Sequence, residues 1–283
     1  MKKFLSLALA LTLCASLAAC SSGGNTSGSN SGSDNTSGSG SGSSSQTQTS
    51  DMQYVKDKGT LVVGITEFEP MDYQDADGNW IGFDADMAAA FAEYLGVKVE
   101  FQVIDWDSKI MELDGKTIDV AWNGMTLTED VKAAMECSNP YFNNAQVVIV
   151  PADKAADYQT VESVQDLAFS VEVGSAGKEQ ADAYGFNYTE AADQATALLE
   201  VSSGTADAAI IDYLMSVAMT GEGTSYADLT STVSLNEEQY GVGFRKGSDL
   251  VDAFNEFWKQ AVADGTVEQI AATYGLQDAV ILE

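Results

Sequence analysis

The sequence contains no histidine and only one arginine, Arg245. A chain without histidine cannot build a Ser-His-Asp triad, a Cys-His pair or the usual zinc sites, which excludes the enzyme classes that depend on them. Basic residues of all kinds are few. There are 13 Lys and Arg against 43 Asp and Glu, which gives a formal net charge of −30. This charge argues against nucleic acid and anionic lipid surfaces as partners.

Cysteine is also scarce, and two of the three cysteines lie in the N-terminal segment MKKFLSLALALTLCASLAAC. Two lysines, an apolar run and small residues before Cys20 predict a signal peptide over residues 1–19. An uncleaved membrane anchor is the alternative, but the run is short for a span that needs about 20 residues. The sequence Leu-Ala-Ala-Cys matches the bacterial lipobox and predicts lipid attachment to Cys20. Cys137 then remains alone, as a packed small hydrophobic residue.

Residues 20–50 are predicted to form a tether between the lipid and the folded body. From 21 to 50 the chain is almost entirely Ser, Gly, Asn, Thr and Gln, so it cannot bury enough apolar surface to fold. A flexible chain of this length spans roughly 30 Å. We therefore expect the protein at the outer face of a bacterial cytoplasmic membrane, attached only through its lipid.

Strands and helices alternate from Asp51 onward, which predicts a mostly parallel sheet with helices on both faces. Strands are predicted at 61–65, 97–104, 117–122, 144–150, 167–173, 186–190 and 206–211, and an extended segment at 237–247. Helices are predicted at 82–96, 108–115, 174–185, 193–204, 250–265 and 267–275. Asp84 is expected to cap the first helix, and Gly96 to end it. The sequence DADGN at 75–79 lacks the later ligands of an EF-hand and predicts a hairpin turn.

Eight short motifs, taken in order, resemble one protein family. They are LVVGI with a following EP, GFDADM, IDVAWNGMTLTED, SNPYFNNAQVVIV, VEVGSAGKE, ADAAIIDYLM, YGVGFRKGSDL and ADGTVEQIAATYG. Together they span about 60–275 and are similar to the extracellular amino-acid-binding proteins of ABC importers (solute-binding protein family 3, type II periplasmic-binding fold). The resemblance implies a monomer that captures an amino acid or related small amine and delivers it to the importer's permease.

The fold of that family implies two α/β lobes joined by two extended crossovers, with the ligand in the cleft between the lobes. Carried onto this chain, lobe one comprises 51–148 and 238–283, and lobe two comprises 149–237. The crossovers are expected near Val148–Pro151 and near Asn236–Tyr240.

Two aromatic residues of lobe one are expected to face the ligand. Phe68 follows the first strand, where the family stacks an aromatic ring on the ligand, and Trp106 lies between a strand and a helix. Two such faces can hold an apolar or cationic group. Packing within lobe one is the alternative for both residues. Trp122 fits either role, and Glu67 is a candidate polar residue beside Phe68.

Asn123, Gly124 and Thr126 match the family's loop that hydrogen-bonds the α-carboxylate and α-amine of the ligand. An ordinary strand-to-helix turn is the alternative. Where the family usually has an arginine that clamps the carboxylate, this chain has Val131. Lys132 is adjacent, but one residue along a helix turns a side chain by about 100°. Either backbone amides or a lysine hold the carboxylate, or the ligand lacks one.

Three residues of lobe two complete the expected site. Ser175 opens the helix at 174–185, whose free N–H groups and positive dipole end favour an anion. Asp212 matches the family's carboxylate that accepts the ligand's α-ammonium, with a helix N-cap as the alternative. Glu172 lies near the position that contacts the ligand side chain in some relatives. Such acids predict a preference for positively charged ligands.

Two other functions on this fold stay open. One is an exported dehydratase-like enzyme that uses a carboxylate such as Glu172 as general acid or base. The other is a surface protein that senses a ligand and reports to a membrane receptor. An enzyme would turn over its ligand, whereas a binding protein releases it unchanged. We expect a binding protein with no catalytic residue, no cofactor and no metal.

Overall fold

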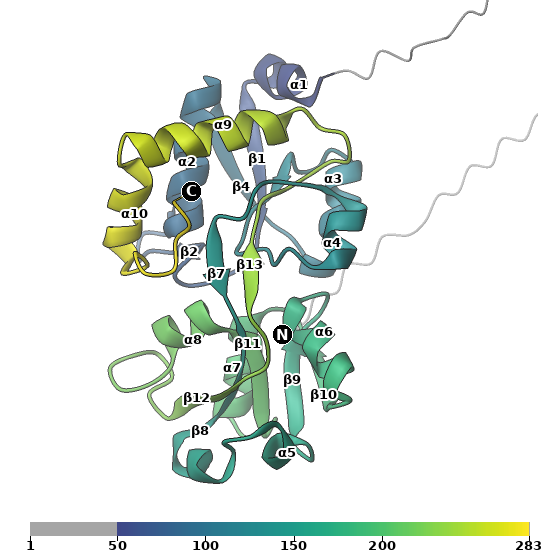
Figure 1. Cartoon of the computed structure of the whole chain (residues 1–283), viewed down its shortest axis with the longest axis vertical. Helices are drawn as coiled ribbons and strands as arrows, with labels where there is room; N and C mark the ends of the chain where they lie inside the picture. Colours follow the sequence, from purple (N-terminus) through teal and green to yellow (C-terminus); the bar gives the residue numbers. More distant parts are fainter. Residues whose placement is uncertain (1–49, 283) are drawn as a thin grey trace, which may run out of the picture. The chain divides into compact units, whose positions relative to one another are not determined.

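Two five-stranded sheets organise residues 50–282, the part of the chain that the structure, a computed structural model, describes (Figure 1). Each sheet and its helices form one lobe. The predictions of a signal peptide, of a lipidated Cys20 and of a tether up to residue 49 fall outside the described residues. Between residues 50 and 282, no helix combines the length and the apolar character needed to cross a membrane.

The sheet of lobe one has the strand order β4-β1-β5-β14-β6. Its strands are β1 (Thr60–Ile65), β4 (Lys98–Val103), β5 (Val120–Ala121), β6 (Glu136–Cys137) and β14 (Gly243–Phe244). Strands β4, β1 and β5 run parallel, as the alternation of strands and helices predicts, whereas β14 is antiparallel to both β5 and β6. The chain therefore returns to its first sheet after building lobe two.

The helices of lobe one pack their apolar faces against this sheet. They are α1 (Asp51–Lys58), α2 (Phe83–Leu95), α3 (Lys109–Asp114), α4 (Glu129–Ala134), α9 (Leu250–Ala263) and α10 (Thr266–Tyr274), with the 3-10 turn η1 (Trp106–Ser108). In α9 the buried side chains of Phe254, Trp258 and Ala261 form one apolar face. Val251 and Val262 are partly buried and pack against the same core.

A hairpin of β2 (Tyr73–Gln74) and β3 (Trp80–Ile81) encloses the predicted DADGN turn. The carboxylate of Asp75 accepts hydrogen bonds from the N–H groups of Asp77 and Asn79, each at 2.9 Å. These bonds close the turn locally, so the hairpin interpretation is confirmed.

The start of α2 differs from the prediction. Gly82 is the N-cap residue, and Asp84 lies inside the first turn, fully buried. Its Oδ2 atom accepts hydrogen bonds from the N–H of Gly124 and the hydroxyl of Tyr141, both at 2.7 Å. The prediction that Asp84 caps the helix is therefore wrong, because partners distant in sequence take its carboxylate. Gly96 ends the helix in the left-handed conformation, as predicted.

The sheet of lobe two has the strand order β10-β9-β11-β8-β12. The strands are β8 (Gln146–Pro151), β9 (Ala168–Glu172), β10 (Asn187–Ala191), β11 (Ala208–Asp212) and β12 (Leu229–Ser234); the helices are η2 (Ala152–Asp157), α5 (Val161–Val164), α6 (Ala176–Tyr184), α7 (Gln194–Ser202) and α8 (Tyr213–Met219). Strands β9 and β11 are parallel neighbours, and nearly all of their residues are buried. Their last residues, Glu172 and Asp212, therefore reach the same edge of the sheet.

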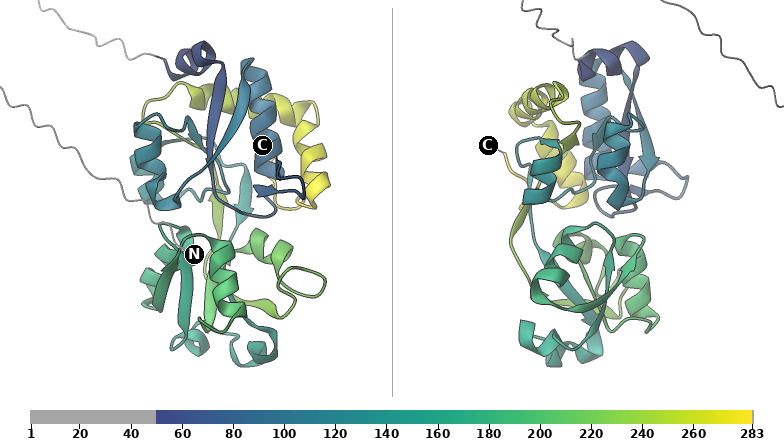
Figure 2. Two further views of the ribbon diagram at one scale, coloured as in Figure 1. Left: turned by 180° about the vertical axis from the view of Figure 1, so that it is seen from behind. Right: turned by 90° about the vertical axis from the view of Figure 1, so that its right-hand side faces the viewer.

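Two short strands connect the lobes. They are β7 (Phe142–Asn144) and β13 (Glu238–Tyr240), which pair antiparallel. Figures 1 and 2 show this pair between the two sheets, with the C-terminal helices α9 and α10 returning to lobe one. The second crossover lies where it was expected, near Asn236–Tyr240. The first does not, because the expected Val148–Pro151 lies inside β8, which joins the sheet of lobe two from Gln146.

Candidate functional site

One small cavity lies where the carboxyl ends of the parallel strands of both sheets meet. All eight residues predicted as ligand-binding line it: Phe68, Trp106, Asn123, Gly124, Thr126, Glu172, Ser175 and Asp212. The remaining lining residues are Lys109, Met125, Thr128, Val131, Gly174, Ala176, Glu179 and Gln194. Ligands of α/β proteins commonly bind outside the carboxyl ends of the strands. The geometry therefore makes this cavity the candidate site.

The cavity is nearly closed. Its volume is about 30 Å³, far below the roughly 300 Å³ of a small ligand pocket. Gly174 of lobe two, with φ of 69°, lies directly against lobe one, and a Cβ atom added there would lie 2.7 Å from the Cα atom of Asp107. Backbone thus meets backbone at this point. A ligand can enter only when the lobes separate.

A wider groove adjoins the cavity on the side of the two hinge strands. Its volume is about 1130 Å³. It shares Thr126, Thr128, Ala176 and Glu179 with the cavity, so these residues form the boundary between the two spaces.

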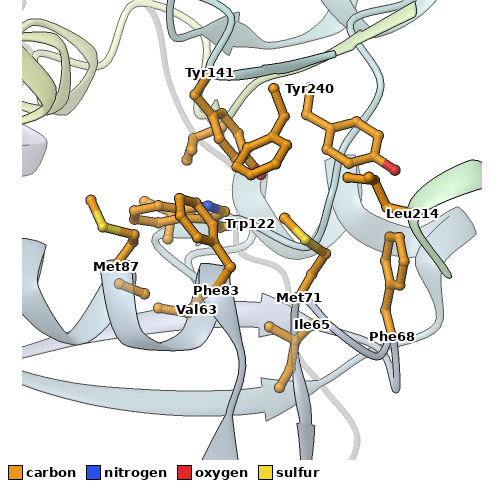
Figure 3. Close-up of a cluster of buried hydrophobic side chains, with 14 of the residues drawn as sticks. Val63, Ile65, Phe68, Met71, Phe83, Met87, Trp122, Tyr141, Leu214 and Tyr240 are labelled. Atoms are coloured by element: carbon orange, nitrogen blue, oxygen red, sulfur yellow. The ribbon is translucent and has the colours of Figure 1, made fainter. Parts of the chain in front are cut away.

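The two predicted aromatic residues both reach the cavity. Phe68 is 2% exposed and meets Tyr240 edge-to-face, with ring centroids 6.4 Å apart. Trp106 is also buried. Figure 3 shows Phe68 near Tyr240 and Leu214, at the edge of the apolar cluster away from Trp122. Ligand contact and packing are therefore compatible for Phe68, because the ring borders both the core and the cavity.

Trp122 and Glu67, left open by the sequence, lie outside the cavity lining. Trp122 is fully buried and packs edge-to-face on Phe254, with ring centroids 5.0 Å apart. Glu67 is exposed, and its carboxylate accepts a hydrogen bond from the N–H of Gln74 at 3.3 Å. Trp122 is thus a core residue of lobe one, and Glu67 is a surface residue of the hairpin.

The loop from Asn123 to Thr126 is held by lobe one itself. The side chain of Asn123 accepts hydrogen bonds from the N–H and hydroxyl of Thr66 and donates to Asp72 Oδ2 at 2.8 Å. The N–H of Gly124 donates to Asp84, and the hydroxyl of Thr126 donates to Glu238 at 2.9 Å. The donors that the sequence assigned to the ligand in Asn123 and Gly124 are therefore already engaged.

Gly124 has a steric reason to be glycine. Its φ is 55°, and a Cβ atom there would lie 2.4 Å from the ring of Phe68. An L side chain is disfavoured at this φ even without a neighbour. The glycine therefore lets the loop approach Phe68 and positions that ring at the cavity.

Four side chains donate hydrogen bonds to the carboxylate of Asp212, one of the acids that line the cavity. Its Oδ1 atom accepts hydrogen bonds from Asn144, Gln146 and the hydroxyl of Tyr240, and Oδ2 accepts one from Gln194. Burial and the nearby Glu238 raise the pKa of Asp212 to about 7, although these donors oppose the rise. Asp212 occupies the N-cap position of α8 without a side-chain cap bond, so the capping alternative does not account for its carboxylate.

Glu172, the neighbour of Asp212 in the cavity lining, is held by fewer hydrogen bonds. It is 2% exposed, and its Oε1 atom has no hydrogen-bond partner among residues 50–282. Burial, with the neighbouring Asp212 and Asp193, raises the pKa of Glu172 to about 8. A buried carboxylate oxygen without a partner is costly, so the site favours a donor or a cation at this point.

Ser175 is the N-cap residue of α6. Its hydroxyl donates to the carbonyl of Glu172 at 2.8 Å and accepts from the N–H of Lys178 at 3.1 Å. The hydroxyl is therefore used within lobe two. What Ser175 offers the cavity is the orientation of α6, whose first residue, Ala176, lines the cavity with the positive end of the helix dipole.

The sequence analysis did not single out the lysine that lines the cavity. Val131 lines the cavity, whereas Lys132 pairs with Glu129 at 3.3 Å and does not line it. Arg245 is buried elsewhere in lobe one, bonded to Asp51 and backbone carbonyls. Of the basic residues between 50 and 282, Lys109 alone lines the cavity. In SKIMELDG it resembles an ordinary surface lysine of a helix, so no local signal marks it.

Known proteins resemble this chain over most of its length. A model of the bacterial extracellular solute-binding proteins, family 3, matches residues 61–277. The arginine-binding extracellular protein ArtP of Bacillus subtilis is 29% identical over 222 residues, covering 75% of this chain and 85% of ArtP. The L-cystine-binding protein TcyJ of Escherichia coli is 26% identical over 221 residues, covering 77% of this chain and 83% of TcyJ.

Solved structures agree with these sequence relatives. A crystal structure of a mutant of ArgBP from T. maritima has a TM-score of 0.74 at 30% identity, covering 79% of this chain and 98% of that one. The two-lobed α/β fold predicted from the motifs is confirmed by this likeness. The chain belongs to the bacterial extracellular solute-binding proteins, family 3.

Proposed function

We propose that this protein captures a positively charged amino acid, or a related small amine, between its lobes and delivers it to the permease of an ABC importer. Asp212 carries the proposal. Four side chains fix its carboxylate at the cavity, and among residues 50–282 its Oδ2 atom accepts a hydrogen bond from Gln194 alone. A carboxylic oxygen can accept a further bond, which an ammonium group would supply together with its charge.

The charge around the cavity favours a cationic ligand. The acids Glu172, Glu179 and Asp212 line it, against the single base Lys109. With pKa values of about 7 and 8, Asp212 and Glu172 are half and mostly protonated at neutral pH, and a cation bound beside them would favour their ionised forms. Trp106 and Phe68 offer ring faces that suit an aliphatic or cationic group. The arginine-binding ArtP and ArgBP are among the similar proteins, which supports a basic amino acid.

A catalytic role has less support. A cyclohexadienyl dehydratase of Pseudomonas aeruginosa is 25% identical over 134 residues, about half of each chain. Glu172, with a pKa of about 8, could donate a proton at neutral pH. The binding proteins resemble more of this chain, and we propose that the ligand is released unchanged. Chromatography of a bound ligand after prolonged incubation tests this, since any product would favour the enzyme.

The N-terminal segments support attachment to the cell surface. We propose that residues 1–19 are removed, that Cys20 is lipidated and that residues 20–50 tether a monomeric body to the membrane. Incorporation of labelled fatty acid in a bacterial host should be lost in Cys20→Ser, and incorporation that persists would contradict the anchor.

A ligand screen tests the proposed function. The protein from Thr47 to Glu283 is heated with each of the twenty amino acids, cystine, polyamines and choline-like cations. A ligand at 100 times its Kd stabilises the folded state by about 2.7 kcal/mol, enough to raise the melting temperature by several degrees. We expect the largest shifts from basic amino acids, and no shift for them in Asp212→Asn. Shifts from none of the amino acids would overturn the proposal.

A further inference from the structure

Lys109 occupies an unusual position for a lysine. It begins α3 in lobe one, is 6% exposed and folds back over the ring of Trp106, with Nζ 4.8 Å from the ring centroid. Its Nζ donates to the carbonyl of Trp106 at 3.1 Å and, across the cleft, to the carbonyl of Gly174 at 3.0 Å. Away from the hinge strands, this is a direct hydrogen bond between the lobes.

Two neutral carbonyls do not neutralise this ammonium group. A lysine has three N–H donors, and the two bonds to Trp106 and Gly174 use two of them. Burial lowers the pKa of Lys109, and the negative charges of Glu172, Asp107 and Glu179 act against this. None of these three acids forms a salt bridge with Lys109 within 4.0 Å among the described residues. The remaining donor is thus available to a ligand that enters the cavity.

The surroundings of Lys109 suit an anionic group on that ligand. Gly174, its partner across the cleft, stands two residues before the start of α6, so the ammonium lies close to the positive end of this helix. Asp212 and Glu172 lie at the ends of the neighbouring strands β11 and β9. An amino acid has an ammonium group to place on Asp212 and a carboxylate, which needs a cation nearby.

We propose that Lys109 binds the carboxylate of the ligand, together with the first N–H groups of α6, and so takes the role that an arginine at position 131 would have. This inference rests on the proposed function, since it names the groups that the captured ligand must carry. The site then selects ligands with both an ammonium group and a carboxylate. Because Lys109 also contacts Gly174, carboxylate binding occurs at the junction of the two lobes.

Matched ligand pairs test the role of Lys109. L-arginine and agmatine differ by one carboxylate, and L-cystine and cystamine differ by two. We expect the wild-type protein to bind the member with the carboxylate at least 30-fold more tightly in at least one pair, measured by calorimetry. In Lys109→Met, which keeps the length and removes the charge, this ratio should fall below threefold while the affinity for the amine is kept. Lys109→Arg should retain the preference.

A control variant and two kinds of contrary result complete this test of Lys109. Lys132→Met removes an exposed lysine outside the cavity lining and should leave both affinities unchanged. Retained preference in Lys109→Met, or equal wild-type affinities within each pair, would overturn the role of Lys109 and leave the proposed function intact. If Lys109→Met fails to fold, loss of the preference in a folded Lys109→Leu decides in its place. A wild-type protein that binds none of the four compounds or any amino acid would remove the proposed function as well.

Discussion

Each lobe contains two buried carboxylic acids whose pKa is raised, and the two pairs differ in what they contact. Asp72 and Asp84 in lobe one are both 0% exposed, and Glu172 and Asp212 in lobe two are 2% and 4% exposed. Burial raises the pKa of all four groups, to about 7 for Asp84 and Asp212 and to about 8 for Glu172. By burial and pKa alone, the two pairs look equivalent.

Their positions separate them. The lobe-one acids accept hydrogen bonds from Asn123, Gly124 and Tyr141 and do not line the cavity. They fix the loop that forms one wall. The lobe-two acids line the cavity. Among residues 50–282, an oxygen without a hydrogen-bond partner occurs in both pairs, on Asp72, Asp84 and Glu172, so it does not distinguish them. A perturbed pKa marks a candidate functional residue. In this protein, however, the pKa does not distinguish acids that hold the cavity wall in place from acids that can contact a ligand. Only their position, behind the wall or facing the cavity, makes that distinction.

The largest expected effect separates the two pairs directly. Asp212→Asn should weaken binding of L-arginine by about 100-fold, because a charge-assisted hydrogen bond of about 2.7 kcal/mol is lost. Asp72→Asn, an equivalent change in the lobe-one pair, should alter the affinity less than threefold. Calorimetry on both variants checks this. Equal losses would show that the lobe-one acids also act on the ligand.

The pH dependence of binding should follow the lobe-two pair. With a pKa of about 7, Asp212 is roughly 3% ionised at pH 5.5 and roughly 90% ionised at pH 8. The affinity for L-arginine should therefore rise by roughly 30-fold over this range, since the ligand keeps its positive charges. The same titration on Asp212→Asn should be much flatter. A flat profile in the wild-type protein would contradict the assignment.

The smallest expected effect concerns stability. Glu172 is protonated in the folded state up to pH about 8, whereas an unfolded Glu loses its proton near pH 4.3. The folded state thus binds more protons between these values, and its stability falls as the pH rises through them. Glu172→Gln should remove this loss and raise the melting temperature at pH 8.5 by several degrees or more.

The control for this measurement is Glu100→Gln, which makes the same charge change at an exposed site. It should leave the pH dependence of the melting temperature unchanged. An equal effect of both variants would mean that the overall negative charge, and not the buried Glu172, governs stability. At pH 4 neither variant should differ much from the wild-type protein.

The sequence predicted the location of the site better than its chemistry. Strand ends are readable from apolar runs, but it was the resemblance to the family that placed residues as far apart as Phe68 and Asp212 in one expected site, and both line the cavity. Side-chain direction is not readable in this way. Asn123 turns its amide into lobe one, Trp122 turns into the core, and Lys109 reaches across the cleft to Gly174, each through contacts with distant segments.

The first crossover illustrates the same limit for the backbone. The segment NAQVVIV is a continuous apolar run, and Val147, Val148, Ile149 and Val150 are all buried. Such a run predicts a buried strand but does not say to which sheet it belongs. The pairing of β8 with β11 decides this, and it places the lobe boundary before Gln146.

Gly174 has a consequence for the importer as well as for the ligand. A Cβ atom at this position would lie 2.7 Å from the Cα atom of Asp107, so only glycine lets the lobes approach this closely. This contact sets a lower limit on the separation of the two lobes. Because the cavity holds only about 30 Å³ at this limit, the lobes must stand farther apart around a bound ligand, so the empty and the loaded protein differ in the span between their outer rims.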